Sequence, residues 1–413
     1  MNATGLIIFA LTYLLISTKR LRWLALDRPG AALLGAVACV AARVLSPAQA
    51  LAAVDGSTLL LLFGMMGMGA FLALDGCFEQ LEQRLSARAG TPARLLGYVL
   101  WGAGFASALI TNDAVCVLAA PLVVRMIQRH RLPALPFLLA LATGANTGSV
   151  ATLVGNPQNM LCGLLGGLSY REHLALLLPV ALAGLGLNHA LLHALFRRPL
   201  SAARLAAAPP PEPFAPGSGL TLLAIGGSVL VYLAGGDLAW TAAGGFALLL
   251  LVRREDPRRL WPRIDWALLV FFAALFAVVQ GFSASGAPAA LFARFPLLVG
   301  GAASGGSTAW LGWLRLAGIF LIGSNLVSNV PFILVVRDQM ATLPDPRLGW
   351  ELLAMASTFA GNLTLIGSVA NVIVAEAGRD VGGIGFWEYL RVGLPVALST
   401  TLLGVVWLVL ILH

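Results

Sequence analysis

Apolar stretches separated by short polar or basic segments run along almost the whole chain. They lie at about 4–18, 30–46, 56–78, 94–110, 114–126, 134–154, 173–196, 218–234, 238–252, 265–282, 311–323, 330–336, 350–366 and 390–412. A helix needs about 20 residues to cross the ~30 Å hydrocarbon core of a bilayer, and several of these stretches are shorter. The pattern therefore predicts an all-α polytopic membrane protein in which some segments are half-helices or hairpins.

Composition supports this prediction. The chain is 59% hydrophobic and 11% charged, with a mean hydropathy of +0.88, whereas charged residues alone make up about a quarter of a soluble protein. The segment 1–18 has no basic residue and is followed by Lys19, Arg20 and Arg22. This order is the reverse of a cleaved signal peptide, so we expect it to remain as the first helix.

The net charge of +8 is distributed as a membrane topology signal, and it does not indicate nucleic-acid binding. If the N-terminus lies outside, the basic loops are cytoplasmic, as the positive-inside rule requires. These loops are 19–30, 79–94, 125–135, 197–217, 253–263 and 375–391. We therefore predict a multi-pass protein of a bacterial-type plasma (inner) membrane with its N-terminus outside.

A Pro-rich segment at 197–217 divides the chain into two similar halves, 1–196 and 218–413. Pro-rich backbone cannot be satisfied in lipid, so we expect a cytoplasmic linker there. Leu178-Pro179-Val180-Ala181-Leu182 recurs as Leu394-Pro395-Val396-Ala397-Leu398, and a glutamate precedes each proline by seven residues. Chance similarity between two Leu- and Ala-rich segments is the alternative to an internal repeat.

Each half predicts the same series of elements: three full helices, a re-entrant hairpin, an interrupted helix and a last helix. The whole chain then has about ten transmembrane helices and two re-entrant hairpins. Five crossings per half place the second half upside down relative to the first, which is the inverted-repeat arrangement of many secondary transporters.

The first predicted hairpin tip, Thr111-Asn112-Asp113, is polar between two apolar arms. A carboxylate at membrane depth costs at least ~2.5 kcal/mol and is kept mainly for ions or protons. We predict that Asp113 is the coupling residue; the alternative is that it caps the following helix. The corresponding position at the second tip is Val330, so one ion or proton site is expected here rather than two.

Two polar, helix-breaking runs at 143–159 and 357–371 predict interrupted helices that expose their carbonyl groups to a solute or ion. A polar contact between helices is the alternative. Together with the two tips, they give the candidate substrate- and ion-binding residues Thr111, Asn112, Asp113, Asn146, Thr152, Gly155, Asn156, Asn159, Ser324, Asn325, Ser328, Asn329, Asn362, Thr364, Gly367, Ser368 and Asn371.

Other polar residues have simpler interpretations. Asp75 is expected at the membrane interface, and His189 and His193 are expected to pack against other helices rather than bind a metal. The four cysteines show no pairing pattern and are expected in the core. We predict no metal site and no cofactor other than a coupling ion.

These motifs resemble the ion transporter superfamily, and within it the branch of arsenite permeases (ArsB type), NhaD sodium/proton antiporters and the melanosomal P protein. The similarity runs from about Leu51 to Leu412. Its most specific parts are the Asn112-Asp113 pair and the Gly361-Asn362-Leu363-Thr364-Leu365-Ile366-Gly367-Ser368 run. In the related divalent-anion:sodium symporters the tips look like Ser-Asn-Thr, from which Asp113 and Val330 depart.

The resemblance implies a scaffold domain, with a homodimer left open, and a transport domain that moves as an elevator. It also implies that the solute site is lined by Thr111, Asn112, Asp113, Thr152, Gly155, Asn156, Ser328, Asn329, Asn362, Thr364 and Gly367. The departure from Ser-Asn-Thr favours the proton-coupled, export-type branch.

The functional prediction is an ion-coupled secondary transporter of a small inorganic solute, with H⁺ or Na⁺ as the coupling ion. Arsenite or antimonite efflux by proton exchange is preferred, because neither polar run holds a Lys or Arg to clamp a dianion. Sodium-coupled uptake of dicarboxylates or other anions and sodium/proton antiport are the alternatives. An enzyme is not expected, since the sequence has no HExxH or GxSxG motif and no paired intramembrane carboxylates.

Overall fold

The computed structural model describes residues 3–17, 26–206, 213–297 and 309–412, and these residues form helices without strands. Lys19, Arg20, Arg22 and the Pro209-Pro210-Pro211 run lie outside these ranges. The first half contains α1 (Ala3–Ser17), α2 (Arg28–Ala41), α3 (Pro47–Ala52), α4 (Gly56–Leu74), α5 (Cys77–Ala89), α6 (Pro92–Leu109), α7 (Asn112–His130), α8 (Ala134–Ser149), α9 (Pro157–Gly166) and α10 (Tyr170–Ala202).

The second half contains α11 (Pro216–Leu233), α12 (Leu238–Arg253), α13 (Pro257–Leu260), η1 (Trp261–Arg263), α14 (Trp266–Ala284), α15 (Ala287–Arg294), α16 (Ala309–Val327), α17 (Asn329–Met340), α18 (Pro346–Leu363), α19 (Val369–Ala377), η2 (Arg379–Val381) and α20 (Phe386–Leu412). The element order of the first half thus recurs in the second. Each half has the same order: a short helix (α5 or α15), a hairpin of two helices (α6–α7 or α16–α17) and then a broken helix (α8–α9 or α18–α19).

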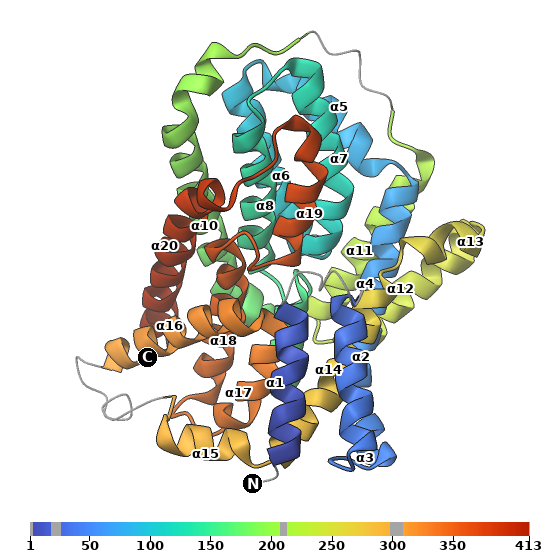
Figure 1. Cartoon of the computed structure of the whole chain (residues 1–413). Coiled ribbons are helices and arrows are strands. Elements are labelled where there is room, and N and C mark those ends of the chain that lie inside the picture. The colour runs from blue at the N-terminus through green and yellow to red at the C-terminus, as the bar shows by residue number, and fades with distance from the viewer. Residues whose placement is uncertain (1–2, 18–25, 207–212, 298–308, 413) are drawn as a thin grey trace.

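The two hairpins lie at opposite ends of the molecule (Figure 1). The α6–α7 hairpin occupies the upper part of the view, and the α16–α17 hairpin the lower part. Between them the broken helices cross: α8 packs on α6 and α7, while α19 from the other half packs on α7 and α8. This crossing brings the two helix breaks, which are far apart in sequence, to the centre of the molecule.

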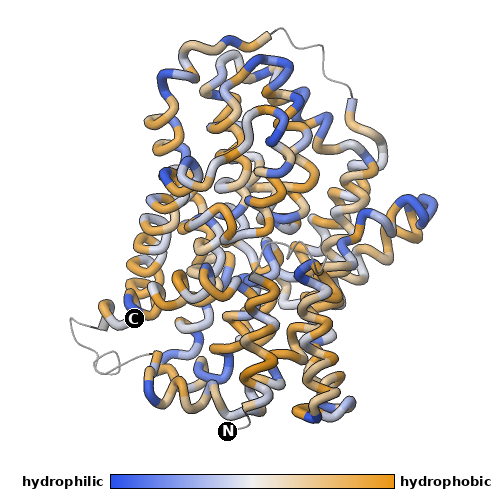
Figure 2. Tube along the Cα trace, in the orientation of Figure 1, coloured by the Kyte–Doolittle hydropathy of each residue, from blue (hydrophilic) through white to orange (hydrophobic). Residues whose placement is uncertain are grey.

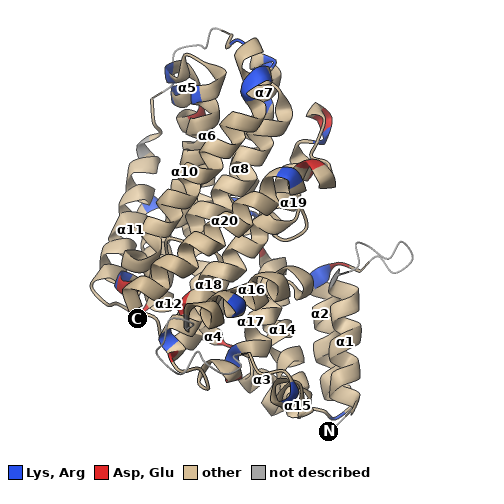
Figure 3. Cartoon of the chain, turned by 90° about the vertical axis from the view of Figure 1, so that its left-hand side faces the viewer, with Lys and Arg blue, Asp and Glu red and all other residues tan. Residues whose placement is uncertain are grey.

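The outside of the molecule is apolar, as a bilayer requires. Leu223, Trp240 and Leu251 are all more than 70% exposed, and the outer helices α1 and α2 are apolar over most of their length (Figure 2). Lys and Arg gather at the ends of α5 and α7, while the helices between carry few charges (Figure 3). Since an aqueous protein rarely exposes so much apolar surface, these faces are adapted to lipid.

Within the described ranges, five helices are long and apolar enough to cross a membrane, namely α4, α10, α14, α16 and α20. Helices α1, α2, α11 and α12 are shorter apolar helices. The prediction of an all-α polytopic membrane protein is confirmed. Helical backbone continues to Ala202 beyond a kink at Phe196, so the first residues of the 197–217 segment are helical.

Asp75 does not lie free at an interface. Its carboxylate forms a bidentate pair with Arg253, with Nη2 to Oδ1 at 2.6 Å and Nη1 to Oδ2 at 2.8 Å, and Thr221 donates to it at 3.0 Å. Both charged side chains are less than 10% exposed. One arginine of the basic 253–263 segment therefore ties α4, α11 and α12 together, because a buried carboxylate needs such partners.

Candidate functional site

The site is built where both broken helices lose their regular backbone. Helix α8 ends at Ser149, and α9 begins at Pro157, whose missing N–H suits the first helical position. Asn156 caps α9, since its Oδ1 accepts from the Asn159 N–H at 2.8 Å. Gly155 lies against the Ser149 carbonyl so closely that a Cβ would collide with it. The first break is thus set by local sequence.

The second break follows the same plan. Helix α18 ends at Leu363, and α19 begins at Val369 with Ser368 at its N-cap position. A Cβ on Gly367 would meet the Ala360 carbonyl at 2.7 Å, so this loop also requires glycine. The loop from Thr364 to Ser368 connects α18 to α19. It approaches the broken helix of the first half, where Ser368 Oγ donates to Asn146 Oδ1.

Asn146 is the centre of a buried amide network. Its Oδ1 accepts from Asn112 Nδ2 at 2.9 Å and from Ser368 Oγ at 3.2 Å. Its Nδ2 donates to Asn362 Oδ1 at 3.1 Å and to Asn371 Oδ1 at 2.9 Å. One side chain therefore connects the first hairpin tip to the second broken helix.

Thr358 has the corresponding role on the second broken helix. Its hydroxyl donates to Asn159 Oδ1 at 2.9 Å and accepts from Asn156 Nδ2 at 3.1 Å. Asn146 and Thr358, Asn156 and Ser368, and Asn159 and Asn371 are equivalent at one constant shift between the halves. Two of the bonds of Asn146, to Asn371 and from Ser368, thus recur in the opposite direction as the bonds of Thr358 with Asn159 and Asn156.

Asn159 and Asn371 also bind the carbonyl groups that the breaks leave free. Asn159 Nδ2 donates to the Ser149 carbonyl at 3.2 Å, and Asn371 Nδ2 donates to the Gly361 carbonyl at 2.6 Å. Buried backbone carbonyls without partners are costly in lipid, so these amides make the interrupted helices tolerable.

The first hairpin tip packs directly on the first break. The Asn112 N–H donates to the Gly155 carbonyl at 2.9 Å, and Thr152 Oγ1 donates to the Ala108 carbonyl at 2.7 Å. Thr111 caps α7, with its Oγ1 accepting from the Ala114 N–H at 3.3 Å. The capping role that was the alternative for Asp113 therefore belongs to Thr111.

The second tip packs on the second break through different atoms. Asn325 Nδ2 donates to the Ala360 carbonyl at 2.9 Å, and its Oδ1 accepts from Thr364 Oγ1 at 3.2 Å. Asn329 Nδ2 reaches the Gly367 carbonyl at 3.4 Å. Ser328 has φ +81° and ψ 145°, a conformation that is essentially limited to glycine. Ser324 is buried, and its hydroxyl has no partner among the described residues.

Asp113 lies in a cavity of about 640 Å³ between the first tip, α4, α19 and the start of α14. Asp265, the N-cap of α14, lines the same cavity, and Val369 and Ile373 of α19 line it as well. The cavity is lined by Met66, Gly69, Ala70, Ala73, Thr111, Asp113, Ala114, Val117, Leu118, Pro262, Arg263, Ile264, Asp265, Trp266, Ala267, Leu268, Val369 and Ile373.

The predicted residues therefore fall into three groups. Asn112, Asn146, Asn362, Ser368 and Asn371 meet in the central network. Asn156 and Asn159 join it through Thr358. The first tip beside the cavity is formed by Thr111 and Asp113, and Thr152 and Gly155 anchor it. The second tip and its support comprise Ser324, Asn325, Ser328, Asn329, Thr364 and Gly367.

Three residues of interest were not predicted: Asp265, His173 and Glu351. Each lies at the start of an apolar segment, His173 directly after Arg171 and Glu172. An ionisable residue at the edge of an apolar segment can indicate function, but it does not say which residues meet. His189 accepts from Trp101 Nε1 at 3.2 Å, in accord with its expected packing role.

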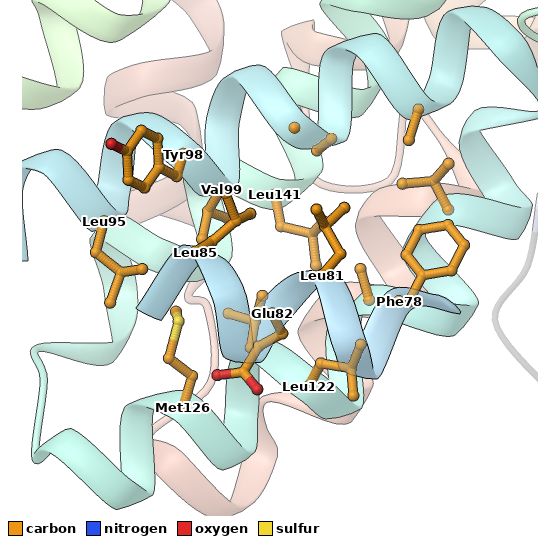
Figure 4. Close-up of a pocket in the computed structure, with 16 residues that line it drawn as sticks. Phe78, Leu81, Glu82, Leu85, Leu95, Tyr98, Val99, Leu122, Met126 and Leu141 are labelled. Atoms are coloured by element: carbon orange, nitrogen blue, oxygen red, sulfur yellow. The ribbon is translucent and has the colours of Figure 1, made fainter. Parts of the chain in front are cut away.

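A second, apolar cavity of about 70 Å³ lies under α5 (Figure 4). Phe78, Leu81 and Leu85 of α5 face Tyr98 and Val99 of α6 across it. Because its walls offer almost no polar atoms, it suits packing rather than a polar solute. Helix α5 thus covers the first hairpin with its apolar face.

Crossed broken helices and two polar hairpin tips define a membrane transporter, and the comparisons agree. The citrate transporter family model (CitMHS) matches residues 13–360. The silicon efflux transporter LSI3 of Oryza sativa subsp. japonica is 30% identical over 97% of this chain and 96% of its own. A protein of Dictyostelium discoideum that carries the transporter name arsB is 24% identical over 98% of this chain and 92% of its own.

The solved structure of the Alcanivorax borkumensis YdaH transporter has the same fold, with a TM-score of 0.55 and 16% identity over 98% of this chain and 96% of its own. The chain belongs to the citrate transporter (CitMHS) family of the ion transporter superfamily. It is a secondary transporter and not an enzyme, as the sequence predicted.

Proposed function

We propose that this transporter exports a small, uncharged hydroxylated oxyacid, with arsenite or antimonite as the preferred substrates, in exchange for protons. The observation that carries the proposal is the chemistry of the central network. It consists of amides and hydroxyls that can donate and accept hydrogen bonds, and no Lys or Arg lies on either broken helix between residues 143 and 159 or 357 and 371. Such donors and acceptors match a neutral polyhydroxylated solute better than a dianion.

The proton-coupling part of the proposal rests on Asp113. Its carboxylate lies beside the amide network at the start of α7, in the cavity that contains Asp265. A carboxylate held at membrane depth near a second carboxylate favours proton or cation binding, because proton or cation binding relieves the repulsion between them. Asp113 would take up a proton from one side and release it as the solute crosses in the other direction.

The name of one relative supports the export direction, since the rice protein is named for silicon efflux. The Dictyostelium protein carries the name arsB, in accord with the resemblance to arsenite permeases. In water near neutral pH, silicon and trivalent arsenic both occur as uncharged hydroxylated acids, which is the solute class that the network fits.

The domain arrangement belongs to the same proposal. Residues 1–196 and 218–413 act as two inverted repeats, with the N-terminus outside, and the hairpins and broken helices move together against α1, α2, α4, α11, α12 and α14 as an elevator. The opposite placement of the two hairpins in Figure 1 and the reciprocal hydrogen bonds between the halves support it. Alternating access around one midplane site is the general mechanism of such repeats.

Sodium-coupled transport of a dicarboxylate is the second candidate. The family is described as citrate transporters, and Arg263 lines the cavity beside Asp113. In this case Asp113 would belong to a sodium site and Arg263 would attract the carboxylate.

Transport by the purified protein in lipid vesicles separates the two candidates. We expect an imposed pH gradient to drive arsenite or antimonite across the vesicle membrane, and a sodium gradient to have no effect. D113N should bind arsenite, seen as thermal stabilisation in detergent, and lose the pH-driven flux. Citrate or succinate movement that depends on sodium, with no response to arsenite, would overturn the export proposal.

A further inference from the structure

A buried acid–base pair lies behind the first helix break. His173 in the first turn of α10 places Nδ1 at 2.7 Å from Glu351 Oε2 on α18. The two side chains are 0% and 1% exposed. Fully buried ionisable side chains are costly, and such groups cluster at functional sites.

The second ring nitrogen determines how the pair holds its protons. His173 Nε2 lies 3.2 Å from the Val150 carbonyl, which can only accept, so Nε2 carries a hydrogen. The other contact, between Nδ1 and Oε2, then needs one proton shared between nitrogen and oxygen. Without that proton two lone pairs would face each other at 2.7 Å. The geometry therefore holds one exchangeable proton.

The pair touches the proposed solute site through a single backbone carbonyl. Val150 follows the last residue of α8, and its carbonyl also accepts from Asn159 Nδ2 at 3.3 Å. Asn159 in turn accepts from Thr358 in the central network. A change in the protonation of His173 would thus change the hydrogen bond that His173 makes to the Val150 carbonyl, which also accepts from Asn159.

A second, half-exposed ion pair lies next to the buried pair along the same two helices. Glu172 precedes His173, and Arg347 lies one turn before Glu351; they pair at 3.2 Å and are about half exposed. Helix α9 contributes the Cys162 thiol as its ionisable group, and α8 contributes no ionisable side chain. The surface pair therefore lies directly beside the buried pair on both helices.

We propose that His173 and Glu351 form a second proton-binding site, which takes a proton from water and returns it as the contacts at the first helix break change. This inference rests on the proposed proton coupling and adds a site to it. Asp113 would bind its proton in the cavity beside the first tip. The His173–Glu351 pair would bind its proton beside the first helix break.

Proton binding is tested first without any solute. Infrared difference spectra between acidic and alkaline pH should contain carboxyl or imidazole signals in the wild-type protein that E351Q lacks. E351Q keeps a hydrogen bond from its amide to Nδ1 and so preserves the packing, and E172Q on the exposed pair is the matched control. If the spectra of E351Q and the wild type agree, the pair does not titrate and the proposal is wrong.

Transport in vesicles then tests coupling, with arsenite as the probe. We expect E351Q to exchange arsenite at equal pH nearly as fast as the wild type, but to lose pH-driven accumulation by roughly tenfold or more. E172Q should retain both. If E351Q keeps pH-driven accumulation, or loses equal-pH exchange as well, the pair is structural. If arsenite is not moved by the wild type but the infrared signals are present, only the proposed solute fails.

Discussion

The two hairpin tips have similar sequences but different backbones and charges. At the first tip Thr111 is extended and caps α7, and Asp113 reaches the cavity beside α14. At the second tip Ser328 has φ +81° and makes no capping hydrogen bond, and an apolar Val330 replaces the carboxylate. The comparison shows that both tips place amide and hydroxyl groups against a helix break, whereas only the first tip carries a carboxylate.

The equivalence of the halves is tested most strongly at the hub of the amide network. N146A removes four hydrogen-bond partners at once and leaves buried amides unsatisfied, so we expect it to lower the free energy of unfolding by about 3 kcal/mol and to abolish transport. Denaturant titration in mixed micelles and vesicle flux are the measurements. T358A, its equivalent with two partners, should cost about 1.5 kcal/mol. Equal costs would show that the two breaks contribute alike.

The difference in charge is tested at Asp113. D113N keeps the size of the side chain but removes proton exchange, and we expect pH-driven flux to fall by about 100-fold. V330N at the second tip is the control and should change the flux by less than about threefold. A pH-driven flux that survives in D113N would place the coupling proton elsewhere.

The difference in capping is tested by removing each hydroxyl. T111A loses the bond to the Ala114 N–H and should destabilise the protein by about 1 kcal/mol. S328A removes no capping bond, and we expect a change below about 0.5 kcal/mol. Thermal unfolding in detergent compares them, and equal shifts would contradict the assignment of Thr111 as the cap.

The difference in backbone is tested by S328G. Glycine relieves the strain at φ +81°, and after its larger entropy cost we expect a net gain of roughly 0.5 kcal/mol in stability. If the strained tip helps to open the site, the same variant should slow equal-pH exchange. A loss of stability on this substitution would mean that the Ser328 side chain holds the tip in place.

Much of this arrangement could be predicted from local sequence. Helix breaks at Gly155-Asn156-Pro157 and at Gly367-Ser368 follow from residues that cannot continue a helix or that cap the next one. The tips were recognisable because polar residues interrupt apolar arms. These features depend on neighbours in the chain, so their sequence signal is strong.

The class of protein, the membrane helices, the two breaks and the two tips follow from the amino-acid sequence, because apolar length and helix-breaking residues act locally. Which polar groups meet depends on the tertiary fold. It joined Asn146 to Asn362 and Asn371, placed Asp265 beside Asp113, and paired His173 with Glu351. These contacts depend on how helices far apart in the sequence cross, and an isolated ionisable residue carries no information about its partner on another helix.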